Sequence, residues 1–123
     1  MKDRIKLGLI TLSLLCVTQA SLAGVSYTKS QQGLPALCSE LSIDLIDLSN
    51  HQSKPLCQGK LATAGIMVDM AGKYIGRQDN ENAKSYFLKS HQIFDEVDKL
   101  DCGNPKAISL MKQREEAIHQ QVA

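Results

Sequence analysis

Apolar residues recur at intervals of three and four along most of the chain after residue 33. This spacing places them on one side of an α-helix, and strand-like alternation of useful length is absent from the sequence. The pattern predicts four helices, over about residues 34–49, 56–77, 79–100 and 105–121. We therefore predict an all-α fold, most simply an up-down four-helix bundle formed by one domain of residues 24–123.

Residues that favour the start of a helix lie at the predicted boundaries. Pro35, Pro55 and Pro105 each suit a first turn, where the missing amide hydrogen is not needed. Asp79 or Asn80 can cap the third helix, because a side-chain oxygen there accepts a hydrogen bond from a free backbone amide. Local chemistry and periodicity therefore predict the same boundaries.

The second predicted helix is apolar over much of its circumference, which indicates a central position. It also contains four glycines, each of which costs an α-helix roughly 0.5–1 kcal/mol relative to alanine. Gly65 and Gly72 lie one heptad apart and face the same way, whereas Gly59 and Gly76 lie near the ends. We expect a neighbouring helix to approach closely at these glycines.

Residues 67–94 resemble a single helical hairpin of the tetratricopeptide repeat family. The matching small and aromatic positions are Ala71, Tyr74, Ala83, Phe87 and Ser90. That family places small residues where its paired helices touch, and its folds need about three or more repeats. No second copy is found one repeat length upstream or downstream. The resemblance implies a close-packed helix hairpin, with a TPR-like hairpin array as the alternative architecture.

The first 23 residues have the pattern of a secretory signal peptide. Three basic residues (Lys2, Arg4 and Lys6) precede an apolar run over 7–17, which is too short to span a bilayer. The small residues that follow predict cleavage before Gly24, with cleavage before Ser21 as the alternative. An uncleaved N-terminal anchor and lipid attachment at Cys16 remain open. We expect a periplasmic or secreted protein.

Removing the predicted leader changes the formal charge from +1 to −1, because residues 1–23 contain three basic residues and one acidic residue. Nucleic acids and anionic membranes both require clustered positive charge. The sequence therefore predicts no nucleic-acid partner, and no stable membrane insertion after cleavage.

The predicted mature chain contains Cys38, Cys57 and Cys102, and export would expose them to an oxidising compartment. In an up-down bundle the start of the second helix and the junction of the third and fourth lie at one end. Cys57 and Cys102 occupy these places, whereas Cys38 is about 18 Å away along the helix axis. We predict a Cys57–Cys102 disulfide and a free, buried Cys38 thiol. A Cys38–Cys57 bond, no intramolecular bond, and Cys38 joined to another chain are the alternatives.

Residue patterns typical of catalysis are absent from the sequence. The three histidines lack the i,i+4 or Cys-x-x-Cys company of a metal site, and no glycine loop follows a strand. We predict no enzyme activity, no metal and no cofactor; a thiol enzyme would require a reactive Cys38. The sequence favours a small exported protein-binding module (an adaptor, accessory factor or inhibitor/immunity-type protein), and the alternative is a periplasmic stress or holdase-like chaperone. Tyr86 and Lys89 are the candidate partner-binding residues.

Overall fold

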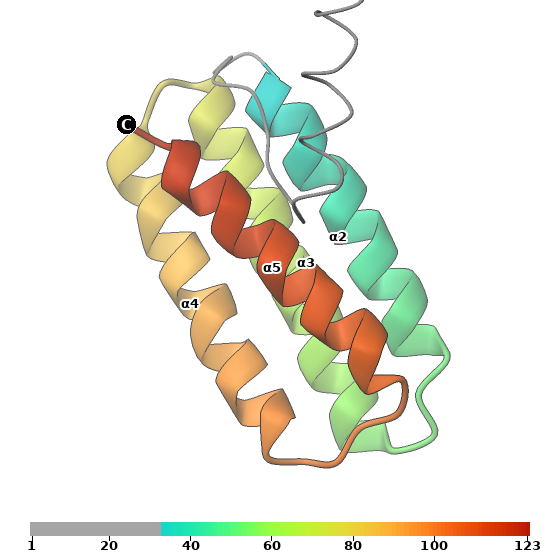
Figure 1. The fold of residues 1–123 in the computed structure, drawn as a ribbon. Helices are drawn as coiled ribbons and strands as arrows, with labels where there is room; N and C mark the ends of the chain where they lie inside the picture. Colours follow the sequence, from blue (N-terminus) through green and yellow to red (C-terminus); the bar gives the residue numbers. More distant parts are fainter. Residues whose placement is uncertain (1–32) are drawn as a thin grey trace, which may run out of the picture.

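The computed structural model describes residues 33–123, which form four helices (Figure 1). They are α2 (Leu34–Asn50), α3 (Pro55–Gly76), α4 (Asn80–Asp98) and α5 (Pro105–Gln121). The predicted all-α fold is confirmed, and each helix begins and ends within two residues of its predicted boundary. The predicted signal peptide, its cleavage sites and Cys16 lie outside the described residues.

The chain runs up and down through α2, α3 and α4, which lie side by side with α3 in the middle (Figure 1). Helix α5 crosses the front of this layer diagonally and packs against α2 and α4 (Figure 1). The central position of α3 explains its apolar circumference, because α2 and α4 pack against it on two sides. The architecture is a small antiparallel helical bundle.

Local sequence explains where the helices begin. Helices α2, α3 and α5 each have a proline in the first turn. The N-cap of α4 is Asp79, whose carboxylate accepts hydrogen bonds from the backbone amide of Asn82 at 3.2 Å and from its side-chain amide at 2.7 Å. Asn104 precedes α5 in the left-handed conformation (φ 59°) and makes no capping hydrogen bond with its side chain.

One hydrophobic core lies between the four helices. It contains Phe87 and Phe94 of α4 and leucine side chains of α2 and α3, all fully buried. The residues that carry the resemblance to a repeat hairpin lie in this region, since Ala71, Ala83 and Ser90 are also fully buried. The α3–α4 pair is therefore a close-packed hairpin.

Helices α2 and α3 are in close contact at two of the four glycines of α3. A Cβ atom at Gly72 would lie 2.6 Å from the Cβ of Cys38, and one at Gly65 would lie 3.1 Å from the backbone oxygen of Ser42. The predicted close approach is thus confirmed at Gly65 and Gly72. The prediction is wrong for Gly59 and Gly76. A Cβ atom at either position would have no neighbour within 4 Å, so no helix lies close to these two glycines.

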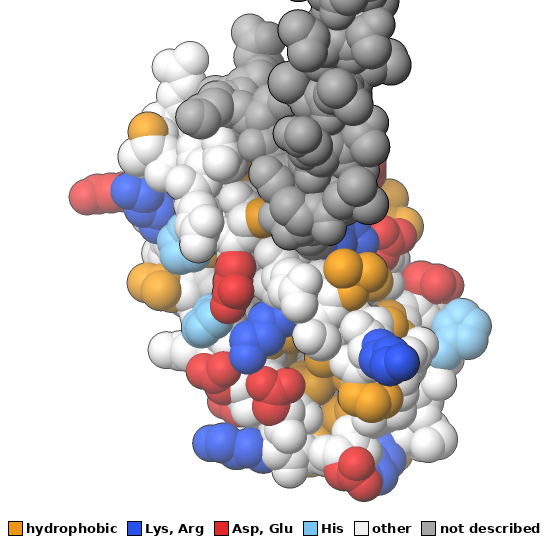
Figure 2. All heavy atoms as spheres, viewed as in Figure 1, with side chains coloured by type: hydrophobic (Ala, Val, Ile, Leu, Met, Phe, Trp, Pro, Cys, Tyr) orange, Lys and Arg blue, Asp and Glu red, His pale blue; other side chains and the backbone are white. Residues whose placement is uncertain are grey.

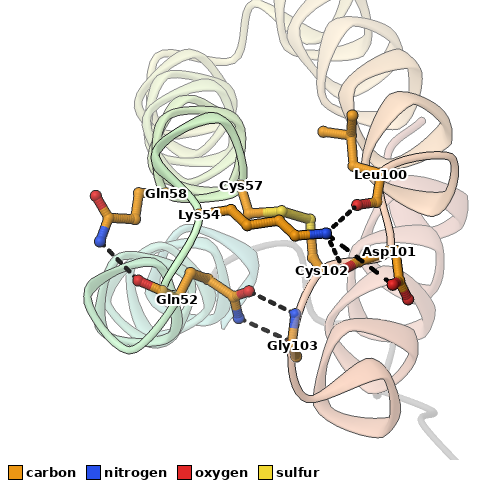
Figure 3. The surroundings of a disulfide bond; sticks show 8 residues. All are labelled: Gln52, Lys54, Cys57, Gln58, Leu100, Asp101, Cys102 and Gly103. Carbon is orange, nitrogen blue, oxygen red and sulfur yellow. Dashed lines mark hydrogen bonds and ion pairs between the residues drawn. A yellow bond between two sulfur atoms is a disulfide. The ribbon is translucent and has the colours of Figure 1, made fainter.

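A disulfide joins Cys57, near the start of α3, to Cys102, in the α4–α5 connection (Figure 3). The two Cα atoms are 5.8 Å apart, within the range that a disulfide requires. The predicted pairing is confirmed, and Cys38 is buried and forms no disulfide with the other described cysteines.

Hydrogen bonds between the α2–α3 and α4–α5 connections surround the disulfide (Figure 3). The side-chain amide of Gln52 donates to the carbonyl of Gly103 at 2.8 Å, and its oxygen accepts from the Gly103 amide at 2.7 Å. Lys54 Nζ donates to the carbonyl oxygens of Leu100 and Asp101, at 3.2 and 3.0 Å. These contacts fix the two connections against each other at one end of the bundle.

Candidate protein-binding surface

Two tyrosines and two basic residues form a row where α3 and α4 meet near their connecting turn. The rings of Tyr74 (α3) and Tyr86 (α4) stack with their centroids 5.5 Å apart and their planes 15° apart. The guanidinium carbon of Arg77 lies 5.4 Å from the centroid of Tyr74, and Lys89 Nζ lies 4.6 Å from that of Tyr86. We call these four residues the tyrosine–cation row.

Helix periodicity explains how the row forms. Each basic residue follows its tyrosine by three positions, so that the two side chains lie on one face of their helix. The short connection between α3 and α4 then brings the two tyrosines into contact. Sequence reasoning selected Tyr86 and Lys89, which the structure places together, but it missed Tyr74 and Arg77 as their partners. The repeated Tyr-x-x-Arg and Tyr-x-x-Lys spacing was the signal that could have identified them.

Neither cation of the row forms an ion pair with a described residue, although the charge of Arg77, after hydrogen bonds from Asn82, helps to lower the pKa of Asp79. Among residues 33–123, no carboxylate oxygen is recorded within 4.0 Å of Arg77 or Lys89. Neighbouring lysines are paired, Lys73 with Asp69 at 3.2 Å and Lys60 with Glu96. The row is therefore a small positively charged area in which each cation lies over a tyrosine ring. Cations held over tyrosine rings in this way contribute about 0.5–1 kcal/mol at exposed sites.

An apolar pocket of about 270 Å³ lies between α3 and α4, nearer the disulfide end of the bundle. Its lining residues are Pro55, Leu56, Gly59, Lys60, Thr63 and Ile93. Leu56 is 56% exposed, and Lys60 directs its charge to Glu96. The pocket therefore presents mainly hydrocarbon to the solvent.

The pocket and the tyrosine–cation row lie on the same side of the α3–α4 pair. Ile93 follows Tyr86 by seven residues, two helical turns, and Thr63 precedes Tyr74 by eleven residues, three turns. Met67, which is partly exposed, precedes Tyr74 by seven residues and lies between them. We call this surface, from the row through Met67 to the pocket, the α3–α4 face.

Other pockets also open on the described part of the bundle. Pockets of about 240 and 390 Å³ flank α5, against α4 and α2 respectively, and one of about 310 Å³ lies between α2 and α3. On the face that α5 covers, charged side chains of both signs are interspersed and hydrophobic side chains show between them in the lower half (Figure 2). Pairing of Arg114 with Asp44 at 2.8 Å and of Lys112 with Asp98 at 3.1 Å accounts for part of this mixture.

Glu115 of α5 places its carboxyl group in the interior of the bundle. Glu115 is fully buried, and its two carboxylate oxygens, together with Ser90 Oγ, are the described buried side-chain atoms without a hydrogen-bond partner. Burial raises the pKa of Glu115 from 4.5 to about 8, with a smaller contribution from Glu116. His91 Nδ1 lies 3.6 Å from Glu115 Oε1. Sequence reasoning missed this residue, although its spacing from Met111 and Ile118 places it on the apolar stripe of α5.

Cys38, the residue on which a thiol enzyme would depend, lies in the interior of the α2–α3 contact. Burial, with contributions from the charges of Asp69 and Glu115, raises the pKa of its thiol to about 12. The thiolate is the reactive form of cysteine, so a raised pKa and full burial make this thiol inert in the folded protein.

Within residues 33–123, no group of three or more histidine, cysteine, aspartate or glutamate side chains is arranged to hold a metal ion. No helix in the described part of the chain is long and apolar enough to cross a membrane.

Comparison of the chain with protein-family models, with curated proteins and with solved structures found no match.

Proposed function

We propose that this protein is a small exported helical module that binds another protein through the α3–α4 face and catalyses no reaction. The tyrosine–cation row is the observation that supports this proposal most directly. Tyrosine and arginine are enriched among the residues that contribute most to protein–protein binding. Tyr74 and Tyr86 also fix each other by stacking, so that less conformational freedom remains to be lost on binding.

The burial of Cys38 and its raised pKa support the part of the proposal that concerns catalysis, because they argue against the thiol enzyme considered from the sequence. The disulfide supports export, since such bonds persist mainly in oxidising compartments. Intact-mass analysis of protein recovered from the periplasm or the medium tests export directly. We expect a chain that begins at Gly24, or secondarily at Ser21. A retained leader, or a lipid-sized mass increment on Cys16, would contradict this expectation.

Affinity capture from the envelope fraction of the native host tests partner binding. We expect the mature protein to retain a partner that Tyr86→Ala and Lys89→Glu variants retain poorly. The matched control is Lys106→Glu, which makes the same change of charge at an exposed position in the first turn of α5. Circular dichroism of each variant must show that the fold is intact, because Tyr86 also packs against the core.

Two outcomes of the capture experiment have different meanings. A partner that is held equally well by all variants would reject the α3–α4 face and leave protein binding standing. Turnover of a small molecule that disappears in Cys38→Ser would reject the binding function itself. The holdase-like chaperone, triggered by acid, is less well supported, because a low pH keeps the buried Glu115 protonated and thereby favours the folded state.

A further inference from the structure

We infer that the α3–α4 face accepts a peptide segment with acidic residues at one end and an apolar side chain at the other. This inference rests on the proposed function and adds the chemistry of the partner and its direction on the surface. The acidic end would lie over the tyrosine–cation row, near the α3–α4 turn. The apolar side chain would enter the pocket near the disulfide end.

The positive charges of the tyrosine–cation row indicate that one end of the peptide is acidic. Arg77 and Lys89 have no recorded carboxylate partner among the described residues, whereas Lys60, at the pocket, is paired with Glu96. Of the two acids between Arg77 and Tyr86, Asp79 uses its carboxylate to cap α4 through Asn82, and Glu81 forms no ion pair with Arg77 or Lys89. On the α3–α4 face, carboxylates of a partner would therefore find cations without an ion pair at the row, and the tyrosines would provide flat surface for the adjoining backbone or side chains.

The apolar pocket determines the other end. Its volume of about 270 Å³ can hold a leucine- or phenylalanine-sized side chain, and the exposed Leu56 at its rim gains from being covered. At 1.5 Å per residue, the spacings along α4 and α3 place the pocket about 10–17 Å from the row. An extended peptide crosses this distance in about three to five residues. Met67 lies along the path, and methionine adapts to varied partners.

A membrane surface fits these observations less well than a peptide. Stable attachment to anionic lipid requires clusters of about four to eight basic residues. The α3–α4 face offers two such cations, because Lys60 and Lys73 are neutralised by their own ion pairs. Two cations beside an aromatic pair and a single apolar pocket match a short peptide segment better.

Selection from a phage-displayed library of random short peptides tests the inference, with the folded mature protein as bait. We expect the selected peptides to carry aspartate or glutamate about three to five residues away from a large apolar residue. Fluorescence anisotropy then measures the affinity of a selected synthetic peptide for the protein and its variants. Phosphatidylglycerol vesicles serve as the membrane probe in a parallel sedimentation assay.

Two variants address the two ends of the surface. Arg77→Glu combined with Lys89→Glu reverses the charge of the row, and Gly59→Leu fills the pocket from a position where a Cβ has no neighbour within 4 Å. We expect each change to weaken peptide binding about tenfold or more. The matched controls, Lys106→Glu and Gly76→Leu, should bind as the wild type does. Gly76 is equally open but lines the pocket between α2 and α3.

Each contrary outcome overturns the inference. The selection contradicts it if no peptide is enriched, or if the selected peptides lack acidic residues. The anisotropy assay contradicts it if the charge-reversed variant binds the peptide as well as the wild type does. The vesicle assay contradicts it if the protein sediments with the vesicles but binds no peptide. None of these outcomes decides the proposed function, which depends on the separate capture of a partner protein and its loss in Tyr86→Ala. The two hypotheses can therefore fail independently.

Discussion

Replacing Glu115 by glutamine should remove a pH dependence of stability that this one buried carboxyl group creates. In the folded protein its pKa is about 8, compared with an ordinary value of 4.5. Between these two values the folded state binds more protons than the unfolded state, so the free energy of unfolding falls as the pH rises. The stabilisation is complete below about pH 4.5, decreases as the pH rises through the interval, and is lost above about pH 8.

The magnitude follows from the size of the pKa shift. One pKa unit corresponds to about 1.4 kcal/mol, so the full shift corresponds to roughly 4–5 kcal/mol between the two limits. A domain of this size has a total stability of about 5–15 kcal/mol, so the effect would be large. The groups that face Glu115 are His91 on α4, Glu116 and Lys112 on α5, and Cys38 on α2.

Urea unfolding of the mature protein, with its disulfide intact, measures this effect between about pH 4.5 and 9. We expect the wild type to lose several kcal/mol across this range and Glu115→Gln to lose much less, so that the variant is the more stable protein at the alkaline end. Glu40→Gln is the matched control, because it makes the same substitution at an exposed position of α2. Parallel pH profiles for the wild type and Glu115→Gln would refute the reasoning.

Three further predictions concern packing and the cysteines. Gly72→Ala should destabilise the fold by about 1–3 kcal/mol in urea unfolding, because the added Cβ would meet the Cβ of Cys38. Gly59→Ala adds a Cβ in open space and should stabilise the fold by about 0.5–1 kcal/mol, so equal effects of the two variants would contradict the close approach at Gly72. Replacing both Cys57 and Cys102 by serine should cost about 4 kcal/mol of stability for a loop of 45 residues, and an unchanged melting temperature would contradict this estimate. Cys38 should not react with a thiol reagent until urea unfolds the protein, and rapid labelling of the native state would show that it is accessible.

The fold was predictable from the sequence because each helix carries both an apolar stripe and a residue suited to its first turn. The spacing of Leu34, Cys38, Leu41 and Leu45 predicted α2 directly, and all four residues are fully buried. The up-down order of the helices was sufficient to pair Cys57 with Cys102, because it places both cysteines at one end of the bundle. Local periodicity and chain connectivity were the physical information used.

Features that depend on contact between helices were only partly predictable. Tyr86 was selected for its residue type, but its partner Tyr74 lies on another helix, and the rotation of the two helices about their axes is set by packing. Glu115 was missed because a charged residue is normally assigned to the surface, and its burial depends on how α5 crosses the other helices. Heptad spacing grouped Gly72 with Gly65 and apart from Gly59, but only the packing of α2 on α3 shows that Gly72 is in close contact and Gly59 is not.

The position of the disulfide closes α3, its turn and α4 into a macrocycle, with α2 and α5 attached outside it. If the two ends of the protein were pulled apart, the force would pass through the sulfur–sulfur bond and bypass the ring. Helices α2 and α5 would then unfold first, and the segment between Cys57 and Cys102 could not extend until the bond was reduced. The α3–α4 face lies wholly on this ring, apart from Pro55 and Leu56 at the pocket rim. Mechanical strain on the chain ends should therefore reach it last.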